Sequence, residues 1–600
     1  KAGLMFDYRR THTCGELRSS HIGKIVTLSG WVHRRRDHGG IIFIDLRDLF
    51  GLTQLVFDPK TISEELFHQA SRLRSEWVIS VKGQVIARTE KMINHKLPTG
   101  ELEIYVKELE ILSSAKTPPF SICDEDIEVN EELRLKYRYL DIRRGLVADN
   151  LLLRHQVMLI TRNFMSEQGF IEISTPILGK STPEGARDYL VPSRIYPGNF
   201  YALPQSPQIF KQLLMISGMD RYFQIAPCFR DEDLRADRQP EFTQIDLEMS
   251  FGTPEDIMGI IKDLMTRVIQ TVSPDIPPLS FPKMSYKDCL ENYGTDHPDL
   301  RFKMPLVRLD DIIEKSEFTI LREQLMQKGC IKALLVKNGA DLSRREIEAY
   351  AQFVSLFGVS GLAWMKCQSE GLSSNITKFF SSDLLTDLTN RMQCEIGDLV
   401  LIAGGEEARI NQGLDHLRRK IAKERNLIDS SSMHFVWVTD FPLLRWNADE
   451  KRIESEHHPF TAPYSEDLEM LNIDPLKVRA LAYDLVLNGY EIGGGSQRIH
   501  NRELQNKIFE ILCLSKNAIQ EKFGFFVEAL EYGTPPHLGF AFGLDRILMI
   551  LAKTENIRDV IAFPKTQKAS DLMMQAPAKV EKKQLNELKV QIEPIEIIWT

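Results

Sequence analysis

The sequence predicts an α+β protein of several domains, in which short strands gather near the N-terminus and longer mixed stretches of helix and strand follow. Three observations support this prediction. The 600 residues are too many for a single hydrophobic core. The composition, with 43% hydrophobic and 26% charged residues, is that of a globular protein. A segment rich in proline, serine and acidic residues, at 113–130, interrupts the chain as an inter-domain linker would.

Five β-rich runs, with one helical run between the third and the fourth, occupy the first hundred or so residues. Turns that contain glycine separate several of them. This order of elements matches the five-stranded Greek-key barrel known as the OB-fold. The predicted strands cover 25–33, 41–47, 52–57, 78–88 and 102–111, and the predicted helix covers 64–74.

Barrels of this kind bind unstacked bases on aromatic side chains beside cationic groups. We expect Arg36 to contact the nucleic-acid backbone, Phe43 to stack on a base and Gln54 to contact a base edge. Each residue also has a plainer interpretation, and burial is the default for Phe43 because it lies in an apolar run. The net charge of -9 does not exclude nucleic acid, because binding depends on local basic patches such as 31–47 and 134–144.

Several classes of protein are disfavoured. No apolar run approaches the ~18 residues that a membrane-spanning helix needs. The polar N-terminal stretch has no signal-like apolar segment. The eight cysteines are scattered without a C-x-x-C pair, which argues against a zinc ribbon or a disulfide framework and favours a reducing compartment. We therefore expect a cytoplasmic protein with no membrane partner.

The first of three informative segments in the larger part of the chain lies at 150–176. Its first twenty residues predict an amphipathic helix, with Asn150 as a plausible N-cap and Gly169 as the C-terminal stop. A strand at 170–174 follows and ends at a Thr-Pro pair containing Pro176. Many α+β proteins contain this order of elements, so the segment alone is weak evidence.

The second segment, at 223–251, predicts two strands joined by a charged loop. In its second strand, Gln244, Asp246 and Glu248 alternate, which places three polar groups on one face. Such a face is either exposed to solvent or built to hold a polar ligand.

The third segment, at 537–552, has glycines suited to close backbone approach and then an apolar helix that opens with Asp545 and Arg546. A cation near a helix N-terminus is disfavoured by the helix dipole, and an anionic ligand there would remove the penalty. The alternative is a simple N-cap by Asp545 with a solvated Arg546.

These three segments resemble the three motifs of the class II aminoacyl-tRNA synthetases. Motif 1 corresponds to the helix, strand and Pro176, motif 2 to FRDE at 229–232 with Phe242, and motif 3 to GLDR at 543–546. The chain from about residue 10 to 580 resembles the bacterial-type aspartyl-tRNA synthetases. The stretches most specific to that family are TPEGARDYLVPSR at 182–194, ALPQSPQIFKQLLM at 202–215 and YEIGGGSQRIH at 490–500.

The resemblance implies an N-terminal OB-fold barrel, a catalytic antiparallel sheet flanked by helices and an inserted α/β domain. It also implies ATP and L-aspartate as substrates, Mg²⁺ as cofactor, tRNA-Asp as partner and a homodimer formed through motif 1. The expected parts are an anticodon-binding domain at 1–112, a linker at 113–145, the catalytic domain at 146–299 and 431–562, the insertion at 300–430 and a C-terminal extension at 563–600.

For the nucleotide, the resemblance implies that Arg230 clamps the α-phosphate and the aspartate carboxylate, and that Glu232 accepts a hydrogen bond from the adenine amino group. Phe242 and Arg546 would stack on opposite faces of the adenine, and Arg546 would also meet the γ-phosphate. Arg230, Glu232 and Arg546 are thus the expected catalytic residues. The expected ATP-binding residues are Arg230, Asp231, Glu232, Gln239, Phe242, Glu491, Gly543, Leu544, Asp545 and Arg546.

For aspartate, the resemblance implies that the ammonium meets Glu184, Gln208 and Asp246, and that the β-carboxylate meets Lys211 and Arg498. His457, with the neighbouring His458, is expected to help close the pocket, although isolated histidines are more often structural. The expected aspartate-binding residues are Glu184, Gln208, Lys211, Arg230, Asp246, His457 and Arg498.

Two carboxylates, Asp484 and Glu491, are the expected Mg²⁺ ligands. They are seven residues apart, so a helix through this segment would place them on one face, about two turns apart.

The anticodon contacts implied for the barrel are Arg36, His38, Phe43 and Gln54. We hypothesise that His38 relaxes the reading of the anticodon, so that tRNA-Asn is charged as well as tRNA-Asp. An aspartyl/glutamyl-tRNA amidotransferase would then be a functional partner. The function of the insertion does not follow from the sequence, nor does the identity of a general base for the transfer step.

Alternatives remain open at this point. The nearest are asparaginyl- and lysyl-tRNA synthetase, and a different class is a non-catalytic single-strand-binding protein built on the barrel. A third is a related enzyme that makes asparagine from aspartyl-adenylate without tRNA, although such enzymes lack the barrel. HIGK at 21–24 and KMSYK at 283–287 faintly resemble class I synthetase motifs, but no βαβ unit surrounds them.

Overall fold

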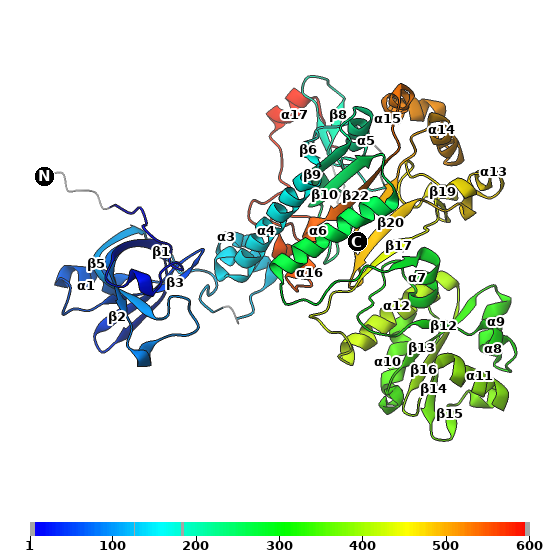
Figure 1. The fold of residues 1–600 in the computed structure, drawn as a ribbon, viewed down its shortest axis with the longest axis horizontal. Coiled ribbons are helices and arrows are strands. Elements are labelled where there is room, and N and C mark those ends of the chain that lie inside the picture. Colours follow the sequence, from blue (N-terminus) through cyan, green and yellow to red (C-terminus); the bar gives the residue numbers. More distant parts are fainter. Residues whose placement is uncertain (1–6, 125–126, 182–184, 594–600) are drawn as a thin grey trace. The chain divides into compact units, whose positions relative to one another are not determined.

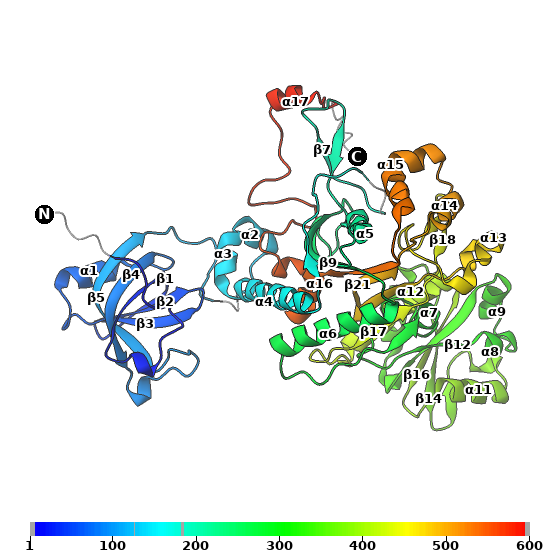
Figure 2. The ribbon, with the colours of Figure 1, turned by 45° about the horizontal axis from the view of Figure 1, so that its top comes forward.

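The computed structural model describes residues 7–124, 127–181 and 185–593, and the chain forms two compact units. One unit comprises residues up to 152 together with 558–578, and the other comprises 153–557 with the residues from 579 onward. Figures 1 and 2 show the elements of both units along the chain. Within the described ranges, no helix is long and apolar enough to cross a membrane.

The N-terminal part is a closed five-stranded barrel with strand order β1-β2-β3-β5-β4, drawn in blue in Figure 1. The predicted OB-fold is confirmed, and β1 runs five residues further than predicted, to His38. Alternation explains the core, because Ile42, Ile44 and Leu46 point inward from β2 and are buried. The elements are β1 (Ile25–His38), β2 (Ile41–Asp48), β3 (Gly51–Phe57), α1 (Glu64–Arg72), β4 (Val78–Ala87) and β5 (Leu102–Ser113).

Two short helices, α2 (Glu131–Lys136) and α3 (Arg138–Asp141), precede the long helix α4 (Leu146–Glu167). The prediction that Asn150 caps this helix was wrong. The helix begins four residues earlier, directly after Gly145, whose φ of 95° suits the break. Asn150 is instead buried inside the helix and donates from Nδ2 to the carbonyl oxygen of Asp559 at 3.1 Å.

Gly169 ends this helical region with a φ of 78°, as predicted. The strand predicted at 170–174 is only two residues long, β6 (Ile171–Glu172), and it pairs in parallel with β9.

An eight-stranded sheet forms the centre of the second unit, with the order β11-β17-β20-β21-β22-β10-β9-β6. Only the outer pairs β11–β17 and β6–β9 are parallel, so the central strands form the antiparallel sheet that the sequence predicts. The remaining strands are β9 (Arg221–Phe229), β10 (Glu241–Ser250), β11 (Lys283–Ser285), β17 (Phe435–Thr439), β20 (Ala482–Leu487), β21 (Tyr490–Gln497) and β22 (His537–Gly543).

Helices and two hairpins surround this sheet. Helix α5 packs on β9 and β10, α6 packs on β22, and α16 packs on β10, β21 and β22. The elements are β7 (Leu190–Pro192), β8 (Phe200–Ala202), α5 (Gln208–Ile216), α6 (Pro254–Val272), α7 (Tyr286–Tyr293), β18 (Leu444–Asn447), β19 (Arg452–Ser455), α13 (Met470–Ile473), α14 (Arg502–Ile511), α15 (Lys516–Ala529), α16 (Leu544–Leu551) and α17 (Lys582–Leu588).

The insertion contains its own five-stranded antiparallel sheet, in the order β12-β13-β16-β14-β15. Strand β16 is apolar throughout because both of its faces are covered: Leu399 and Leu401 face one core, and Val400 and Ile402 face the other. The elements are β12 (Leu306–Arg308), α8 (Asp310–Glu314), α9 (Thr319–Met326), β13 (Cys330–Val336), α10 (Arg344–Ser355), β14 (Ala363–Gln368), β15 (Gly371–Ser373), α11 (Ser382–Met392), β16 (Leu399–Gly405) and α12 (Glu407–Glu424).

Candidate active site

The three segments singled out in the sequence lie on neighbouring strands. β10 pairs with β9 on one side and with β22 on the other, in a register that sets Gln244 opposite Gly543 and Glu248 opposite Gly539. β21 then pairs with β22. The sheet therefore brings motif 2, motif 3 and the glycine-rich YEIGGGSQ strand together.

A cavity of about 580 Å³ opens beside these strands. Most of the residues predicted to bind ATP line it, whereas Asp231 and Leu544 do not: Asp231 lies beside Arg187, and Leu544 is buried in α16. The lining residues are Arg230, Glu232, Leu234, Asp237, Arg238, Gln239, Phe242, Gln244, Arg445, Glu456, Glu491, Ile492, Gly493, Ala541, Gly543, Asp545, Arg546 and Ile557.

Cations and an aromatic ring face this cavity. The guanidinium of Arg230 lies over the Phe242 ring, 5.0 Å from its centroid. Arg546 donates from Nη1 to the carbonyl oxygen of Glu491 and from Nη2 to Oδ2 of Asp237 at 3.3 Å. Asp237 was not predicted to belong to the site. These groups can bind a planar base and a chain of phosphates.

The loop of motif 2 adds a second ion pair at the cavity. Arg238 donates from Nη1 to Oε2 of Glu232 at 2.9 Å, and both side chains remain substantially exposed. The predicted adenine acceptor, Glu232, is thus held by a residue that the prediction did not include. An ATP molecule can replace this contact without exposing a buried charge.

Asp545 orders the start of α16 and is not its N-cap. Gly543 occupies the N-cap position, and the buried carboxylate of Asp545 accepts from the backbone N–H of Thr243 at 2.7 Å and from Arg154 Nη1. Arg154 also donates to the Thr243 hydroxyl at 2.8 Å. The simple-cap alternative is therefore wrong, and Asp545 ties motif 3 to β10 and α4.

A second group of charged side chains lies deep beside β10 and is almost completely buried. Lys211 on α5 donates from Nζ to Oδ1 of Asp246 at 2.6 Å and lies 3.4 Å from Oε2 of Glu248. Arg498 donates to the same Glu248 carboxylate from Nε at 2.9 Å and from Nη2 at 3.1 Å. All four residues are no more than 2% exposed. The two cations proposed to select the amino acid therefore share one carboxylate.

Arg498 is held on its other side as well. Its Nη1 donates to the Ser496 hydroxyl at 2.6 Å and lies 2.8 Å from Nε2 of His458. Desolvation and the neighbouring Arg498 lower the pKa of His458 well below its usual range, so this imidazole is neutral and can accept from the guanidinium. His458 thus positions Arg498.

Gly539 makes this arrangement possible. A Cβ on Gly539 would lie 1.6 Å from Oε2 of Glu248 and 2.7 Å from Nη2 of Arg498. Any other residue at 539 would therefore displace the ion pair, which explains the glycine in the motif 3 strand.

Two polar atoms in this region have no hydrogen-bond partner among the described residues: Oδ2 of Asp246 and Nε2 of Gln208. Burial raises the pKa of Asp246, while Lys211 opposes that shift. Buried polar groups are normally hydrogen-bonded, so this carboxylate oxygen can accept from a further donor such as an ammonium group. Glu184, the other acid predicted here, lies outside the described residues.

Asp484 and Glu491 are not on a helix, so the spacing of two turns on one helical face does not apply. They lie on the antiparallel strands β20 and β21, joined by a two-residue turn at Asn488 and Gly489 with φ values of 52° and 84°. An Asn-Gly pair between apolar runs is a strong hairpin signal, because both residues tolerate positive φ. The apolar content of the segment reflects a strand buried in the middle of the sheet.

The two carboxylates nevertheless influence one another. Desolvation, followed by the neighbouring Asp484 carboxylate, raises the pKa of Glu491, which is open to the cavity but surrounded by protein on its other sides. Oδ1 of Asp484 has no partner among the described residues, and Gly494 leaves room for it, since a Cβ there would lie 2.3 Å away. His457 Nε2 lies 3.4 Å from the other oxygen, and Asp484 raises the pKa of His457 against the opposing effect of desolvation. No group of three or more His, Cys, Asp or Glu that could hold a metal occurs within the described ranges.

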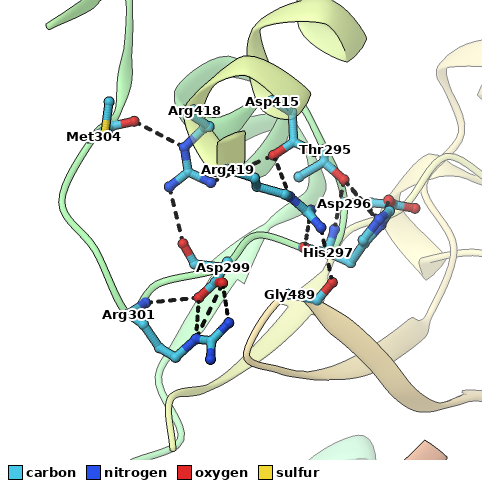
Figure 3. A network of polar contacts seen from close by, with 10 residues as sticks. All are labelled: Thr295, Asp296, His297, Asp299, Arg301, Met304, Asp415, Arg418, Arg419 and Gly489. Atoms are coloured by element: carbon cyan, nitrogen blue, oxygen red, sulfur yellow. Dashed lines mark hydrogen bonds and ion pairs between the residues drawn. The ribbon is translucent and has the colours of Figure 1, made fainter. Parts of the chain in front are cut away.

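The insertion supports the turn that precedes Glu491, as Figure 3 shows. Arg419 on α12 donates to the carbonyl oxygens of His297 at 3.1 Å and Gly489 at 3.5 Å, and its Nε donates to Asp415 at 3.0 Å. A Cβ at Gly489 would lie 3.0 Å from Cβ of Asp299. The insertion therefore contacts the turn that leads into the cavity-lining Glu491.

The residues predicted to bind the anticodon gather on one face of the barrel. Arg36 pairs with Phe43 across β1 and β2, and it donates to Asp45 at 2.7 Å and to Gln54 at 3.3 Å. Phe43 is half-buried and points away from the barrel core, so the burial interpretation was too simple. His38 is exposed at the end of β1, beside the Gly39–Gly40 turn.

An antiparallel sheet that carries these three motifs, together with an OB-fold barrel, defines a class II aminoacyl-tRNA synthetase. Family models agree: residues 130–567 match "tRNA synthetases class II (D, K and N)", and residues 26–112 match "OB-fold nucleic acid binding domain". Proteins named "Aspartate--tRNA(Asp/Asn) ligase" are 63% identical over 598 residues in Protochlamydia amoebophila and 56% identical over 585 residues in Chlamydia muridarum. These alignments cover 100% and 97% of this chain, respectively, and 100% of each relative.

Solved structures share the fold. Asparaginyl-tRNA synthetase from Pyrococcus horikoshii, complexed with asparaginyl-adenylate, matches with a TM-score of 0.57 at 20% identity and covers 92% of this chain and 98% of its own. A putative aspartyl-tRNA synthetase from Leishmania major matches with a TM-score of 0.59 at 19% identity, covering 94% and 95%. The chain belongs to the class II (D, K and N) tRNA synthetases, and within them to the bacterial-type aspartyl-tRNA synthetases.

Proposed function

We propose that this enzyme condenses L-aspartate with ATP to form aspartyl-adenylate, and then transfers the aspartate to tRNA-Asp and tRNA-Asn. One observation carries the choice of amino acid. Lys211 and Arg498, two buried cations, converge on Glu248 beside an Asp246 oxygen that has no partner among the described residues. A ligand with one positive and two negative groups complements this arrangement.

In the proposed complex, the substrate ammonium approaches Oδ2 of Asp246, and the β-carboxylate approaches Lys211 and Arg498. Arg230 binds the α-carboxylate and the α-phosphate, a task suited to a planar guanidinium with two parallel donors. The aspartate carboxylate oxygen then attacks the α-phosphorus, and pyrophosphate leaves. Because the charge stays on phosphate oxygens throughout, positioning and electrostatics supply most of the catalysis.

Phe242 and Arg546 are proposed to hold the adenine between them. Asp237 pairs with Arg546, and Glu232 pairs with Arg238, at the positions proposed for the phosphates and the base. Partly exposed ion pairs of this kind cost little to break, so ATP can displace these carboxylates readily.

The two cations also provide discrimination against asparagine. Its side-chain amide presents N–H groups to Lys211 and Arg498, which can only donate. The donors of these two buried cations that Asp246 and Glu248 do not use would then lack an acceptor, at a cost of about 3–5 kcal/mol, which corresponds to roughly 10²–10³-fold rejection or more. The two cations therefore disfavour asparaginyl-tRNA synthetase. Lysyl-tRNA synthetase is disfavoured because the positively charged side chain of lysine would be repelled by Lys211 and Arg498.

Asp484 and Glu491 fit a divalent cation. One oxygen of Asp484 has no partner among the described residues, and burial followed by the Asp484 charge raises the pKa of Glu491, so a positive ion held by these residues would stabilise both carboxylates. With phosphate oxygens and water, they supply the hard oxygen ligands that Mg²⁺ prefers. The ion would neutralise phosphate charge. The proposed role of the two residues is to hold it.

Charging of two tRNAs is proposed on the names of the relatives, both "Aspartate--tRNA(Asp/Asn) ligase", and on the exposed His38 at the barrel turn. An aminoacylation assay with purified tRNA-Asp and purified tRNA-Asn tests whether both are charged. We expect both to be charged with aspartate and His38→Leu to lower charging of tRNA-Asn selectively. If no aspartyl-tRNA-Asn forms, the proposal that both tRNAs are charged is wrong, and no amidotransferase is needed.

A homodimer through motif 1 is proposed because apolar side chains are exposed around α4 and the edge strand β6. Leu159, Ile171, Ile177 and Leu178 are between 45% and 53% exposed. Light scattering after gel filtration should give twice the mass of the chain, and a monomer would contradict the proposal. The scattered cysteines, which include no C-x-x-C pair, support a reducing compartment, the cytoplasm. The domain boundaries given above remain predictions.

The activation step is tested by ATP–pyrophosphate exchange with single amino acids. We expect exchange with aspartate and little with asparagine or lysine. Exchange that is indifferent to aspartate would overturn the proposed function.

A further inference from the structure

One cation at the ATP cavity has no role in the reaction described so far. Arg445 lies on β18, outside all three motifs, yet it lines the cavity together with Arg230, Glu491 and Arg546. The hairpin formed by β18 and β19 supplies it, at a part of the chain that the sequence did not single out. Its side chain is 56% exposed.

The ion pair between Arg445 and Glu454 is long. Across the hairpin it faces Glu454, and the closest approach, Nη2 to Oε2, is 3.7 Å. Glu454 is shared with Arg452, which approaches its Oε1 at 3.0 Å. A direct charged hydrogen bond is normally about 2.7–2.9 Å long, so Arg445 does not make one with Glu454. Its donors are available for an anion in the cavity.

Neighbouring groups indicate which part of a nucleotide Arg445 would meet. Glu456, which follows the same hairpin and also lines the cavity, is adjacent to His457, and His457 contacts Asp484. Burial raises the pKa of the Tyr286 hydroxyl most, while Glu456 raises it further and Arg445 lowers it, so both side chains lie near this ring. Arg445 therefore lies on the same side of the cavity as Glu456, next to His457 and the proposed Mg²⁺ ligand Asp484.

We propose that Arg445 binds the β- and γ-phosphates of ATP and the pyrophosphate that leaves. This inference rests on the proposed function for the placement of the triphosphate beside Asp484 and Glu491. The P–O bond between the α- and β-phosphates breaks as aspartate attacks, and negative charge builds on the departing pyrophosphate. A guanidinium at that position stabilises the departing group, and it also binds pyrophosphate in the reverse reaction.

The first test is direct binding of ATP with Mg²⁺, without aspartate, by isothermal titration calorimetry. We expect Arg445→Ala to weaken ATP binding about 10- to 100-fold, the range for losing a charge-assisted contact, and Arg445→Lys to recover part of it. Arg452→Ala is the matched control, because Arg452 is a cation on the same hairpin that does not line the cavity. ATP binding by Arg445→Ala within twofold of this control would overturn the inference.

The second test is aspartate-dependent ATP–pyrophosphate exchange. We expect Arg445→Ala to raise the KM for ATP and for pyrophosphate and to leave the KM for aspartate unchanged. If the KM values for ATP and pyrophosphate are unchanged and a parallel aminoacylation assay gives a raised KM for tRNA, then Arg445 serves the tRNA and the inference is wrong. If the unmodified enzyme shows no aspartate-dependent exchange, the proposed function fails, whereas the calorimetric result still decides the role of Arg445.

Discussion

The two ends of the site hold their cations in opposite ways. At the amino-acid end, Lys211 and Arg498 are 2% exposed and pair with buried carboxylates at 2.6–2.9 Å. At the ATP end, the side chains of Arg238 and Arg546 are 43% and 25% exposed and pair with accessible carboxylates at 2.9 Å and 3.3 Å. Both ends bind anions in the proposed reaction, but only one of them is rigid before the ligand arrives.

This difference matches what each end must distinguish. Aspartate differs from asparagine by one group, so discrimination requires fixed cations whose charges cannot be satisfied by an amide or by water. In the proposed reaction, the many charges of ATP displace the loosely held carboxylates. We therefore propose that the buried end provides specificity and that the open end provides binding and release.

The largest effect is expected from Glu248→Gln. This change leaves Lys211 and Arg498 without their shared charge, and breaking a buried pair costs about 3–5 kcal/mol of unfolding free energy. Urea denaturation followed by circular dichroism measures the loss. Glu232→Gln, in the exposed pair at the ATP end, is the control and should change stability by less than about 1 kcal/mol. Equal losses of unfolding free energy in the two variants would contradict the difference between the buried end and the open end.

A second expectation concerns pH. Burial raises the pKa of Asp246 above the ordinary aspartate value of about 3.9. On acidification, the Asp246 carboxylate therefore becomes protonated at a higher pH than an ordinary aspartate does. The charged form is present above the raised pKa and is needed for the ammonium, so the KM for aspartate should rise on acidification. Initial rates of pyrophosphate exchange at a series of pH values measure it. A KM that stays flat down to the ordinary carboxyl range would contradict the role given to Asp246.

A smaller effect should follow from loosening the turn behind Glu491. Arg419→Ala removes the donor to the Gly489 carbonyl from the insertion. We expect the KM for ATP to rise by a few-fold, in line with the loss of one long, partly exposed hydrogen bond, and the KM for aspartate to stay the same. Arg409→Ala, on the same helix but paired only at the surface with Glu406, is the matched control. Equal changes in the KM for ATP and the KM for aspartate would show that the turn affects both ends of the site.

The smallest effect is expected at Asp237. If this carboxylate only holds the place of a phosphate on Arg546, then Asp237→Ala should tighten ATP binding by up to about fivefold, since an exposed pair is worth ~1 kcal/mol at most. Calorimetry with ATP measures the change. Weaker binding would show that Asp237 orients Arg546 for the nucleotide and does not compete with it.

The sequence predicted the barrel well, because the barrel strands follow simple alternation. The FRDE and GLDR stretches place residues at the cavity from a few neighbouring positions, and their role in binding ATP stays a prediction. For Asp484 and Glu491, the spacing was considered for a helix, whereas the Asn-Gly pair between them is the signal for the hairpin that the chain forms.

The buried end could be predicted only in part. Its central pair joins Glu248 and Arg498, which are 250 residues apart, so their contact depends on the packing of the whole sheet. The positioning roles of Arg154, Arg419 and His458 were missed for the same reason. Each contacts a partner on another element, and no short-range pattern marks such contacts.

The most direct test of the account is to measure ATP–pyrophosphate exchange with aspartate and with asparagine for the unmodified enzyme and for Lys211→Met. Two pre-paired cations predict a preference of roughly 10²-fold or more for aspartate in kcat/KM, and a loss of most of that preference in Lys211→Met. Asparagine supporting exchange as well as aspartate does, or a preference unchanged by Lys211→Met, would contradict it.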